Sequence, residues 1–158
     1  MRGEVHLNDG SVLARLESMN PAYTLRNVRG DGNCGVYAVL QALHPEQNYL
    51  NVQPNDERWN EAQNLRNALP KGRLRREMAQ NASDYRYWIE DSDFQYFARY
   101  LDRNILFVSE VGQCIEYDHN GNIQVYNNLE EAFEKKAQNA IIIYHNGIDH
   151  FETIVPMS

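Results

Sequence analysis

The spacing of apolar residues changes near residue 104, and this change limits the fold more than any other feature. Before it, apolar residues recur at helical spacing, as in residues 91–103. After it, short apolar runs alternate with turn residues, which predicts a strand at 104–109 and a hairpin at 114–126 with Asn120 and Gly121 at its turn. Helices that come first and strands that follow one another indicate an α+β domain, with helices packed on a small, mostly antiparallel sheet.

The other expected elements follow from the same signals and from helix-capping residues. Helices are expected at 11–18, 34–43, 55–69, 72–80, 91–103 and 129–137. Residues 23–28 are expected to form a short strand or an extended lead-in, and two strands should lie on either side of the turn at 145–148. The helix at 34–43 is apolar nearly all round, so it should be buried, and it should stop before Pro45. A chain of 158 residues can bury one core, so we expect a single domain over residues 1–158.

The net charge indicates which partners to expect, and the cysteine content indicates the cellular compartment. The net charge of -7 and the pI of about 5.2 disfavour nucleic acid and favour a basic partner or substrate. The basic run 71–80 is expected to be the solvated face of a helix. Two cysteines make no disulfide framework, the N-terminus has no apolar signal core, and no segment has membrane-spanning length. We therefore expect a soluble protein of the reducing cytoplasm. We also expect it to be a monomer.

The stretch "GDGNC" places a thiol at the predicted start of a buried helix. A cysteine acts as a nucleophile only as its thiolate, and the unpaired N–H groups of a helix start stabilise negative charge near Cys34. Asn33 is a plausible N-cap. Glycines at 30, 32 and 35 let backbone N–H groups converge on one point, as an oxyanion hole requires. The alternative is that Cys34 is a small buried residue at the head of a core helix.

A catalytic thiol needs a proton partner, normally a histidine. The five histidines are His6, His44, His119, His145 and His150. His6 falls in a polar N-terminal segment, His44 at the far end of the Cys34 helix, and His119 at a hairpin tip. His145 and His150 both belong to the closing strand pair, so these two are the candidates from the residues alone.

"GDGNC" before an apolar helix and the late "YHNGIDHFETIV" together resemble the ovarian-tumour (OTU) class of papain-like cysteine proteases, which are deubiquitinases. The family signature is Asp-Gly-Asn-Cys at a helix start and His-aromatic-polar near the C-terminus, matched here by residues 31–34 and 150–152. The resemblance spans residues 23–155. It implies a papain-like α+β fold with its core in that range.

The resemblance also implies roles for the matching residues. Cys34 is the expected nucleophile, His150 the general base, and Glu152 or Asp31 the third member, with Asn146 and Asp149 as lesser alternatives; the oxyanion would bind the backbone N–H groups of Asp31, Gly32, Asn33 and Cys34. The chain departs from the family pattern at two positions. Gly35 stands where a bulky apolar residue is usual, and Glu152 stands where Asn or Asp is usual.

The implied activity is thiol-dependent hydrolysis of the isopeptide bond after the C-terminal glycine of ubiquitin or a ubiquitin-like protein. The expected partner is ubiquitin or a polyubiquitin chain, with no cofactor and no metal; neither nucleic acid nor a membrane is expected. Tyr85, Tyr87 and Trp88 could contact ubiquitin or belong to the core. Two other functions stay open: a catalytically weak ubiquitin-binding module on the same fold, and a thiol hydrolase with another substrate.

Overall fold

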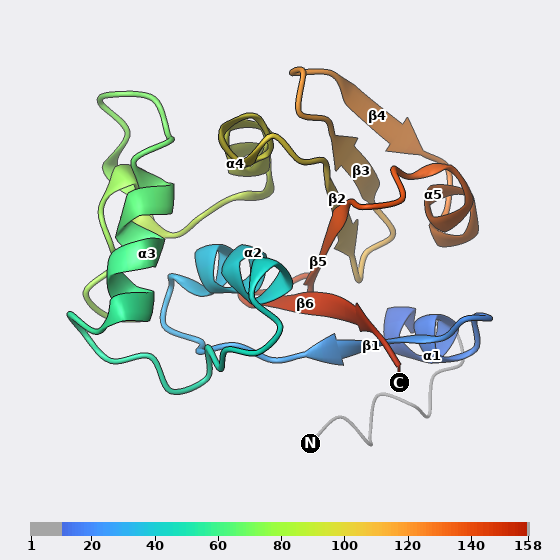
Figure 1. Cartoon of the computed structure of the whole chain (residues 1–158), viewed down its shortest axis with the longest axis horizontal. Coiled ribbons are helices and arrows are strands. Elements are labelled where there is room, and N and C mark those ends of the chain that lie inside the picture. The colour runs from blue at the N-terminus through green and yellow to red at the C-terminus, as the bar shows by residue number, and fades with distance from the viewer. Residues whose placement is uncertain (1–10, 158) are drawn as a thin grey trace.

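A six-stranded sheet divides the molecule into two sides (Figure 1). The structure, a computed structural model, describes residues 11–157. The strand order is β1-β6-β5-β2-β3-β4, with β1 at Tyr23–Arg26, β2 at Ile105–Ser109, β3 at Cys114–Tyr117, β4 at Ile123–Tyr126, β5 at Ile141–His145 and β6 at Phe151–Pro156. Neighbouring strands are antiparallel except for β2 and β5, which are parallel. The predicted α+β fold with a mostly antiparallel sheet is therefore confirmed.

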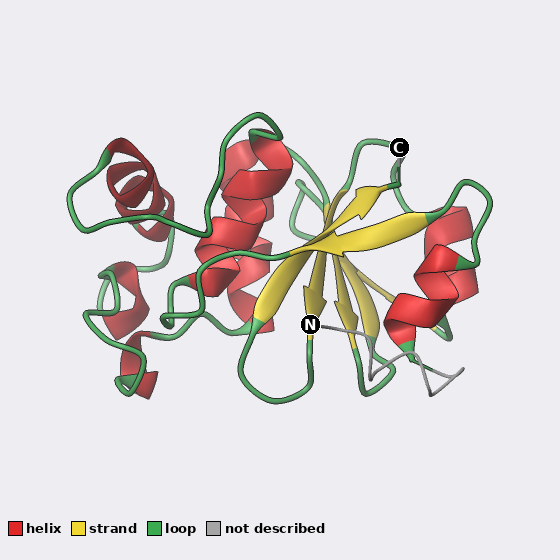
Figure 2. Cartoon of the chain, turned by 90° about the horizontal axis from the view of Figure 1, so that it is seen from below, coloured by secondary structure: helices red, strands yellow, loops and turns green. Residues whose placement is uncertain are grey.

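Helices cover both faces of the sheet, as Figure 2 shows. On one face lie α2 (Cys34–Leu43), α3 (Glu57–Arg66) and α4 (Phe94–Leu101); on the other lie α1 (Val12–Glu17) and α5 (Leu129–Lys135). Within the described residues, no helix is both long and apolar enough to cross a membrane.

Alternation along the central strands creates two separate cores. In β2, Ile105 and Phe107 point toward α2, whereas Leu106 and Val108 point toward α1. We name these the α2-side core, which includes Val36, Leu65, Phe94, Ile105 and Ile143, and the α1-side core, which includes Leu13, Leu16, Leu106, Leu129 and Ile142. The central strands are buried on both faces, which explains their nearly continuous apolar runs.

The start and end of α2 place the site. The helix spans Cys34–Leu43 as the sequence predicts. It ends at His44, whose backbone has left the helical region because Pro45 follows. Thr153 of β6 donates from its hydroxyl to the carbonyl of Ala38 at 2.7 Å, which ties the middle of α2 to the closing strand. The N-terminus of α2 is thereby held beside the first residues of β6.

The helix predicted at 72–80 is wrong: this segment forms only a 3₁₀ turn, η2 (Leu74–Arg76). The carbonyl of Arg75 accepts a hydrogen bond from the buried Arg66 guanidinium at 2.6 Å instead of from a helical N–H. Arg73 and Arg75 both pair with the buried carboxylate of Asp93, at 2.7 and 2.9 Å. The basic run is therefore not a solvated helix face, because its charges are used to fold the segment onto the protein.

Candidate active site

The side chain of Asn33 anchors the loop that leads into α2. Its Oδ1 accepts from Arg66 Nη2 at 2.6 Å and from the Ala79 N–H at 2.8 Å, and its Nδ2 donates to the Ala79 carbonyl at 3.0 Å. Asn33 occupies the N-cap position as expected, but its side chain makes no capping bond because these three buried contacts use it. It therefore fixes the loop from behind.

Arg66 completes this support from α3. Its fully buried guanidinium donates to the carbonyls of Gly32 and Tyr87 at 3.3 and 2.7 Å. These bonds add to the two already described, to the Asn33 side chain and to the Arg75 carbonyl. Burial lowers the pKa of Arg66 to about 10, so the group stays charged at neutral pH. One buried cation thus joins the loop before Cys34 to the 3₁₀ turn η3 (Tyr85–Tyr87).

Two glycines, one in the loop before α2 and one in the first turn of α2, leave room for the segment that crosses them. Gly32 has a φ of +89°, and a Cβ there would lie 2.3 Å from Trp88 Nε1. A Cβ on Gly35 would lie 2.9 Å from the Cβ of Ile89. Ile89 therefore occupies the space that a bulky residue after the cysteine would need, which gives the departure at Gly35 a physical reason.

Cys34 is buried, with 4% of its surface exposed. The N–H of Phe151 donates to its Sγ at 3.5 Å. The pKa of Cys34 is raised to about 11: burial is the main cause and the charge of Asp31 adds to it, while the N–H groups of Phe151, Gly35 and Cys34 act in the opposite direction. The expected stabilisation of the thiolate by the helix start is thus present but outweighed, and the resting group is a thiol at neutral pH.

Asp31 is engaged within the same loop. Its carboxylate pairs with Arg29 Nε at 2.9 Å and accepts from the Asn33 N–H at 3.0 Å. The Asn33 N–H, one of the four expected oxyanion donors, is therefore already used by the Asp31 carboxylate. The backbone N–H groups of Asp31, Gly32 and Cys34 remain the expected donors.

A residue that the sequence did not indicate contacts His150. That residue is Asn27, which directly follows β1: its Oδ1 lies 2.6 Å from Nε2 of the His150 ring. The same Oδ1 accepts from the Val28 N–H at 2.9 Å, so it is the amide oxygen and the imidazole must be the donor. A neutral His150 then carries its proton on Nε2, and Nδ1 is its basic nitrogen. A Cβ added to Gly30 would lie 3.4 Å from this Nδ1, so the ring lies over the loop that leads to Cys34.

Asn27 was missed because the signal that identifies it is long-range. The antiparallel pairing of β1 with β6 sets Arg26 opposite Thr153 and so brings the residues after β1 beside those before β6. No periodicity in 23–28 reveals this pairing. An amide at the end of the strand that precedes "RGDGNC" is the one local cue.

The other expected third residues occupy different surroundings. Glu152 is buried in β6, and because Thr153 faces α2, alternation places Glu152 on the α1 side of the sheet. Asn146 Oδ1 accepts from the N–H groups of Ile148, Asp149 and His150 and so shapes the turn before β6. The role expected of Glu152 or Asp31 stays a prediction.

The remaining histidines make other contacts. His44 Nε2 lies 3.3 Å from a carboxylate oxygen of Glu61, and His119 Nδ1 lies 2.8 Å from Oδ1 of Asn104. His145 packs edge-to-face on Phe151, with ring centroids 4.6 Å apart, and burial lowers its pKa. His6 lies outside the described residues. Among the histidines that the structure describes, these placements leave His150 as the one over the loop before Cys34.

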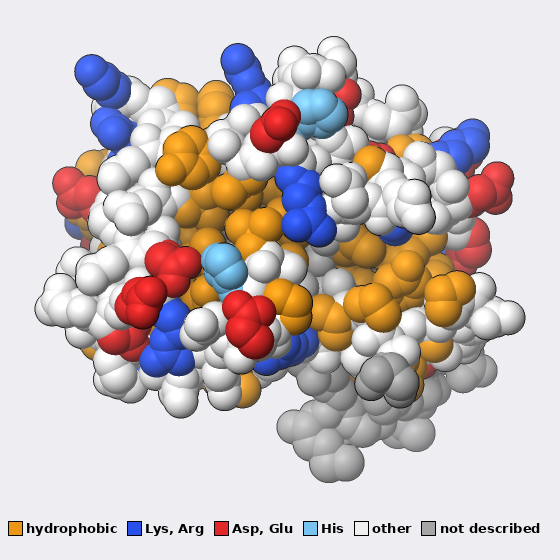
Figure 3. All heavy atoms as spheres, viewed as in Figure 1, with side chains coloured by type: hydrophobic (Ala, Val, Ile, Leu, Met, Phe, Trp, Pro, Cys, Tyr) orange, Lys and Arg blue, Asp and Glu red, His pale blue; other side chains and the backbone are white. Residues whose placement is uncertain are grey.

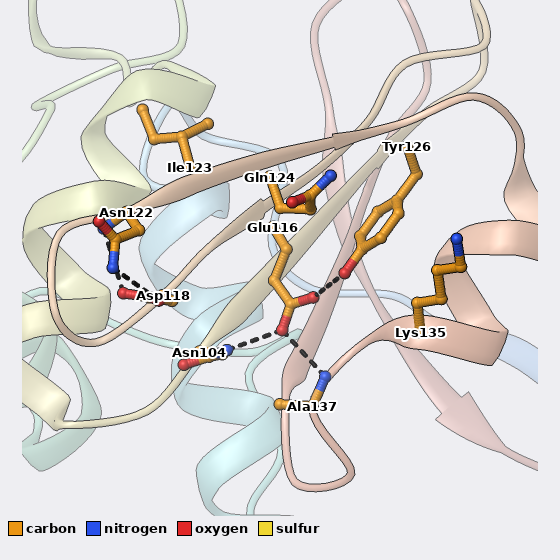
Figure 4. A pocket seen from close by; sticks show the side chains of 9 residues that line it. All are labelled: Asn104, Glu116, Asp118, Asn122, Ile123, Gln124, Tyr126, Lys135 and Ala137. Atoms are coloured by element: carbon orange, nitrogen blue, oxygen red, sulfur yellow. Dashed lines mark hydrogen bonds between the residues drawn. The ribbon is translucent and has the colours of Figure 1, made fainter.

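A separate cavity of about 390 Å³ lies between the β2–β4 region and the segment after α5 (Figure 4). Its buried acid, Glu116, accepts from Tyr126 Oη at 2.6 Å, Asn104 Nδ2 at 2.7 Å and the Ala137 N–H at 3.0 Å. These three donors satisfy the carboxylate within the protein. Glu116 therefore supports the packing of the sheet and carries no evident chemistry.

Comparison with solved structures identifies the fold. An OTU deubiquitinase from Wolbachia pipientis wMel bound to ubiquitin matches with 13% identity and a TM-score of 0.54, covering 85% of this chain and 96% of that chain. A further structure of an OTU deubiquitinase from Wolbachia pipientis wMel matches with 14% identity and a TM-score of 0.52, covering 85% and 88%. No protein-family model and no curated protein matches the chain. The chain has an OTU-type, papain-like fold, as its sequence motifs imply.

Proposed function

We propose that the protein is a cysteine deubiquitinase that cleaves after the C-terminal glycine of ubiquitin. The observation that carries the proposal is the 2.6 Å contact between Asn27 Oδ1 and His150 Nε2, next to the helix start that holds Cys34. It orients an imidazole with its basic nitrogen over residues 30–33, the loop that leads to Cys34 and that we name the glycine loop. A cysteine hydrolase requires such a base near its thiol. The OTU-type fold, which the Wolbachia deubiquitinase shares in complex with ubiquitin, supports the same activity.

The chemistry follows from these positions. His150 Nδ1 takes the proton of Cys34 as the sulfur attacks the carbonyl carbon, because the resting thiol is protonated. Backbone N–H groups at the start of α2 bind the oxyanion. The His150 imidazolium then gives its proton to the leaving amine, and water hydrolyses the thioester with the same imidazole as base. Asn27 keeps the ring in the required orientation throughout.

A cavity of about 330 Å³ offers a place for the ubiquitin tail. It lies beside Phe151 and is lined by Ile89, Glu90, Asp91, Phe107, Ser109, Val111, Gln113, His145, Gly147 and Phe151. The resemblance implies a tail with arginines before its terminal glycines. Aromatic rings can pack on the apolar part of such a tail, and the carboxylates of Glu90 and Asp91 can pair with its guanidinium groups.

One observation favours a second function, a ubiquitin-binding module without turnover. Cys34 is almost completely buried, with Trp88 against Gly32 and Ile89 against Gly35. A site that never opens would bind ubiquitin through its surface and leave the thiol unused. The two functions differ in whether Cys34 reacts.

The test uses ubiquitin whose C-terminal carboxyl group carries a propargylamide, which forms a stable vinyl thioether with a catalytic thiolate. The wild-type protein should be labelled at Cys34, and the Cys34→Ala variant should not. A panel of di-ubiquitin linkages, read by gel, then measures turnover. Ubiquitin binding without labelling or cleavage would support the binding module, and iodoacetamide-sensitive activity on other peptides without ubiquitin labelling would indicate another thiol hydrolase.

A further inference from the structure

The pairing between β5 and β6 ends before the two strands do. Its last pair is Ile143 with Thr153, although β5 begins at Ile141 and β6 continues to Pro156. Beyond that pair, β5 stays beside β2 and β6 stays beside β1 (Figure 1). The sheet is therefore open between β5 and β6 at this end.

A cavity of about 500 Å³ lies at this opening, and we name it the sheet-end cavity. Its apolar wall includes Ile141 and Ile142 of β5, Ile154 of β6 and Ala42 near the end of α2. Ala42 lies eight residues from Cys34 along α2, which is about 12 Å at the helical rise. The sheet-end cavity shares no lining residue with the cavity beside Phe151, so it is separate from the candidate active site.

Three half-buried cations line the sheet-end cavity: Arg26 of β1, Arg103 before β2 and Lys136 after α5. No aspartate or glutamate is among its described lining residues. Within residues 11–157, none of the three cations forms an ion pair with a carboxylate. In a chain with a net charge of -7, such a group of cations leaves a local positive charge without a counter-charge.

Backbone carbonyls hold the two arginines in place. Arg26 donates from Nη1 to the Pro45 carbonyl at 2.6 Å and from Nη2 to the Gln47 carbonyl at 2.7 Å. Arg103 donates from Nε to the Asn139 carbonyl at 2.6 Å. A carbonyl fixes a guanidinium without cancelling its charge, and each guanidinium has five N–H donors, so further donors remain for a ligand. Both arginines are therefore oriented before any anion binds.

Lys136 lies in a partly dehydrated position. Burial lowers the pKa of Lys136, and the charge of Glu116 acts in the opposite direction. Glu116 itself lines the neighbouring cavity, where three donors satisfy it. Within the described chain, the Lys136 ammonium donates to one acceptor, the carbonyl of the adjacent Ala137 at 3.4 Å. An ammonium that has lost part of its water gains more from a bound anion than a fully solvated one does.

We propose that the sheet-end cavity binds a small molecule that carries two or more phosphate groups and an apolar part, as a nucleoside diphosphate does. The phosphate groups pair with Arg26, Arg103 and Lys136, since three cations match several anionic oxygens better than a single carboxylate. The apolar part packs on Ile141 and Ile154. Small-molecule sites are concave and mostly apolar with a few convergent polar groups, as this cavity is.

Isothermal titration calorimetry at low ionic strength and without Mg²⁺ tests this proposal, with ADP, inorganic pyrophosphate and adenosine as the probes. The wild-type protein should bind ADP more tightly than pyrophosphate, which lacks the apolar part, and more tightly than adenosine, which lacks the charge. Arg26→Gln, Arg103→Gln and Lys136→Gln should each raise the Kd for ADP about tenfold. Arg99→Gln removes the same charge from an exposed position on α4 outside the cavity, and it should leave the Kd unchanged.

Three results would overturn the proposal. The first is no binding of ADP to the wild-type protein at millimolar concentration. The second is an equal loss of affinity in Arg99→Gln, which would indicate attraction to charge in general. The third is a loss of ADP binding in Cys34→Ala, which would place the ligand at the other end of α2. Thermal unfolding without ligand checks each variant, and Lys136→Gln decides the outcome if the arginine variants are unfolded, because its one described hydrogen bond is long.

Discussion

At the scale of single residues, the ionisation of Cys34 decides the reactivity of the site. With a pKa of about 11, the thiolate is a small minority at neutral pH. The rate of Cys34 alkylation by iodoacetamide should therefore keep rising about tenfold per pH unit well above pH 8. Mass spectrometry of the modified peptide measures this rate for Cys34 apart from Cys114. A plateau at or below pH 8 would show that the thiolate already dominates there.

The Asp31→Asn variant checks the electrostatic part of that pKa. The negative charge of Asp31 raises the pKa of Cys34, so its removal should lower this pKa and shift the alkylation profile toward lower pH. Asparagine retains an oxygen that can accept the Asn33 N–H, so the loop keeps this contact. A profile that does not move would mean that burial alone sets the pKa.

Asn27 is the residue whose substitution best tests the orientation of His150. Asn27→Ala removes the acceptor for Nε2, so kcat/KM on a fluorogenic ubiquitin substrate should fall about a hundredfold. Asn27→Asp keeps an acceptor and should retain most of the activity. Asn60→Ala, at an exposed position on α3, serves as a neutral control. A large loss in Glu152→Gln together with a normal Asn27→Ala would assign the third role to Glu152 instead.

At the scale of elements, the sequence predicts a helix correctly where neighbouring residues alone determine its bounds. The bounds of α2 follow from an apolar run that meets Pro45, and they agree with the structure residue for residue. The basic run failed as a helix because its conformation depends on Asp93 and Arg66, which are distant in sequence. Asn27 escaped notice for the same reason: its partner lies 123 positions away. Motifs located Cys34 and His150, whereas the residues that hold them required the fold.

The crossing of Trp88 over the glycine loop can be tested with two glycines of similar backbone. Gly32 and Gly72 have φ values of +89° and +87°, but a Cβ on Gly72 would meet no atom within 4 Å. Gly72→Ala should lower the free energy of unfolding by about 1 kcal/mol from backbone strain alone. Gly32→Ala should cost about 3 kcal/mol, because its Cβ also displaces the Trp88 indole.

Urea unfolding measures both variants, and a double-mutant cycle isolates the contact. If Gly32→Ala is destabilising because of Trp88, its cost should shrink in a Trp88→Ala background, giving a coupling free energy of about 1 kcal/mol or more. Equal costs for Gly32→Ala and Gly72→Ala would remove the basis for a tight crossing at this point.

At the scale of the whole molecule, the site is assembled from segments spread over the chain. It draws on residues after β1, at the start of α2, in α3, around η3 and before β6, all on the α2 side of the sheet. On the face shown in Figure 3, hydrophobic side chains line a hollow, and charged side chains of both signs are scattered around it. Catalysis of the proposed kind therefore depends on the integrity of the complete fold and not on one local motif.

The two free cysteines report on the two cores, because Cys34 belongs to the α2-side core and Cys114 to the α1-side core. If the chain is one cooperative domain, both thiols should become reactive at the same urea concentration. Leu16→Ala, a truncation in the α1-side core, should lower the free energy of unfolding by about 3 kcal/mol. It should shift both labelling midpoints equally, although Leu16 and Cys34 lie on opposite sides of the sheet. We expect this coupling because both cores share the buried strands β2 and β5, so a loss of packing in one core destabilises the other. If Cys114 alone became reactive at a lower urea concentration, the two faces of the sheet would unfold independently.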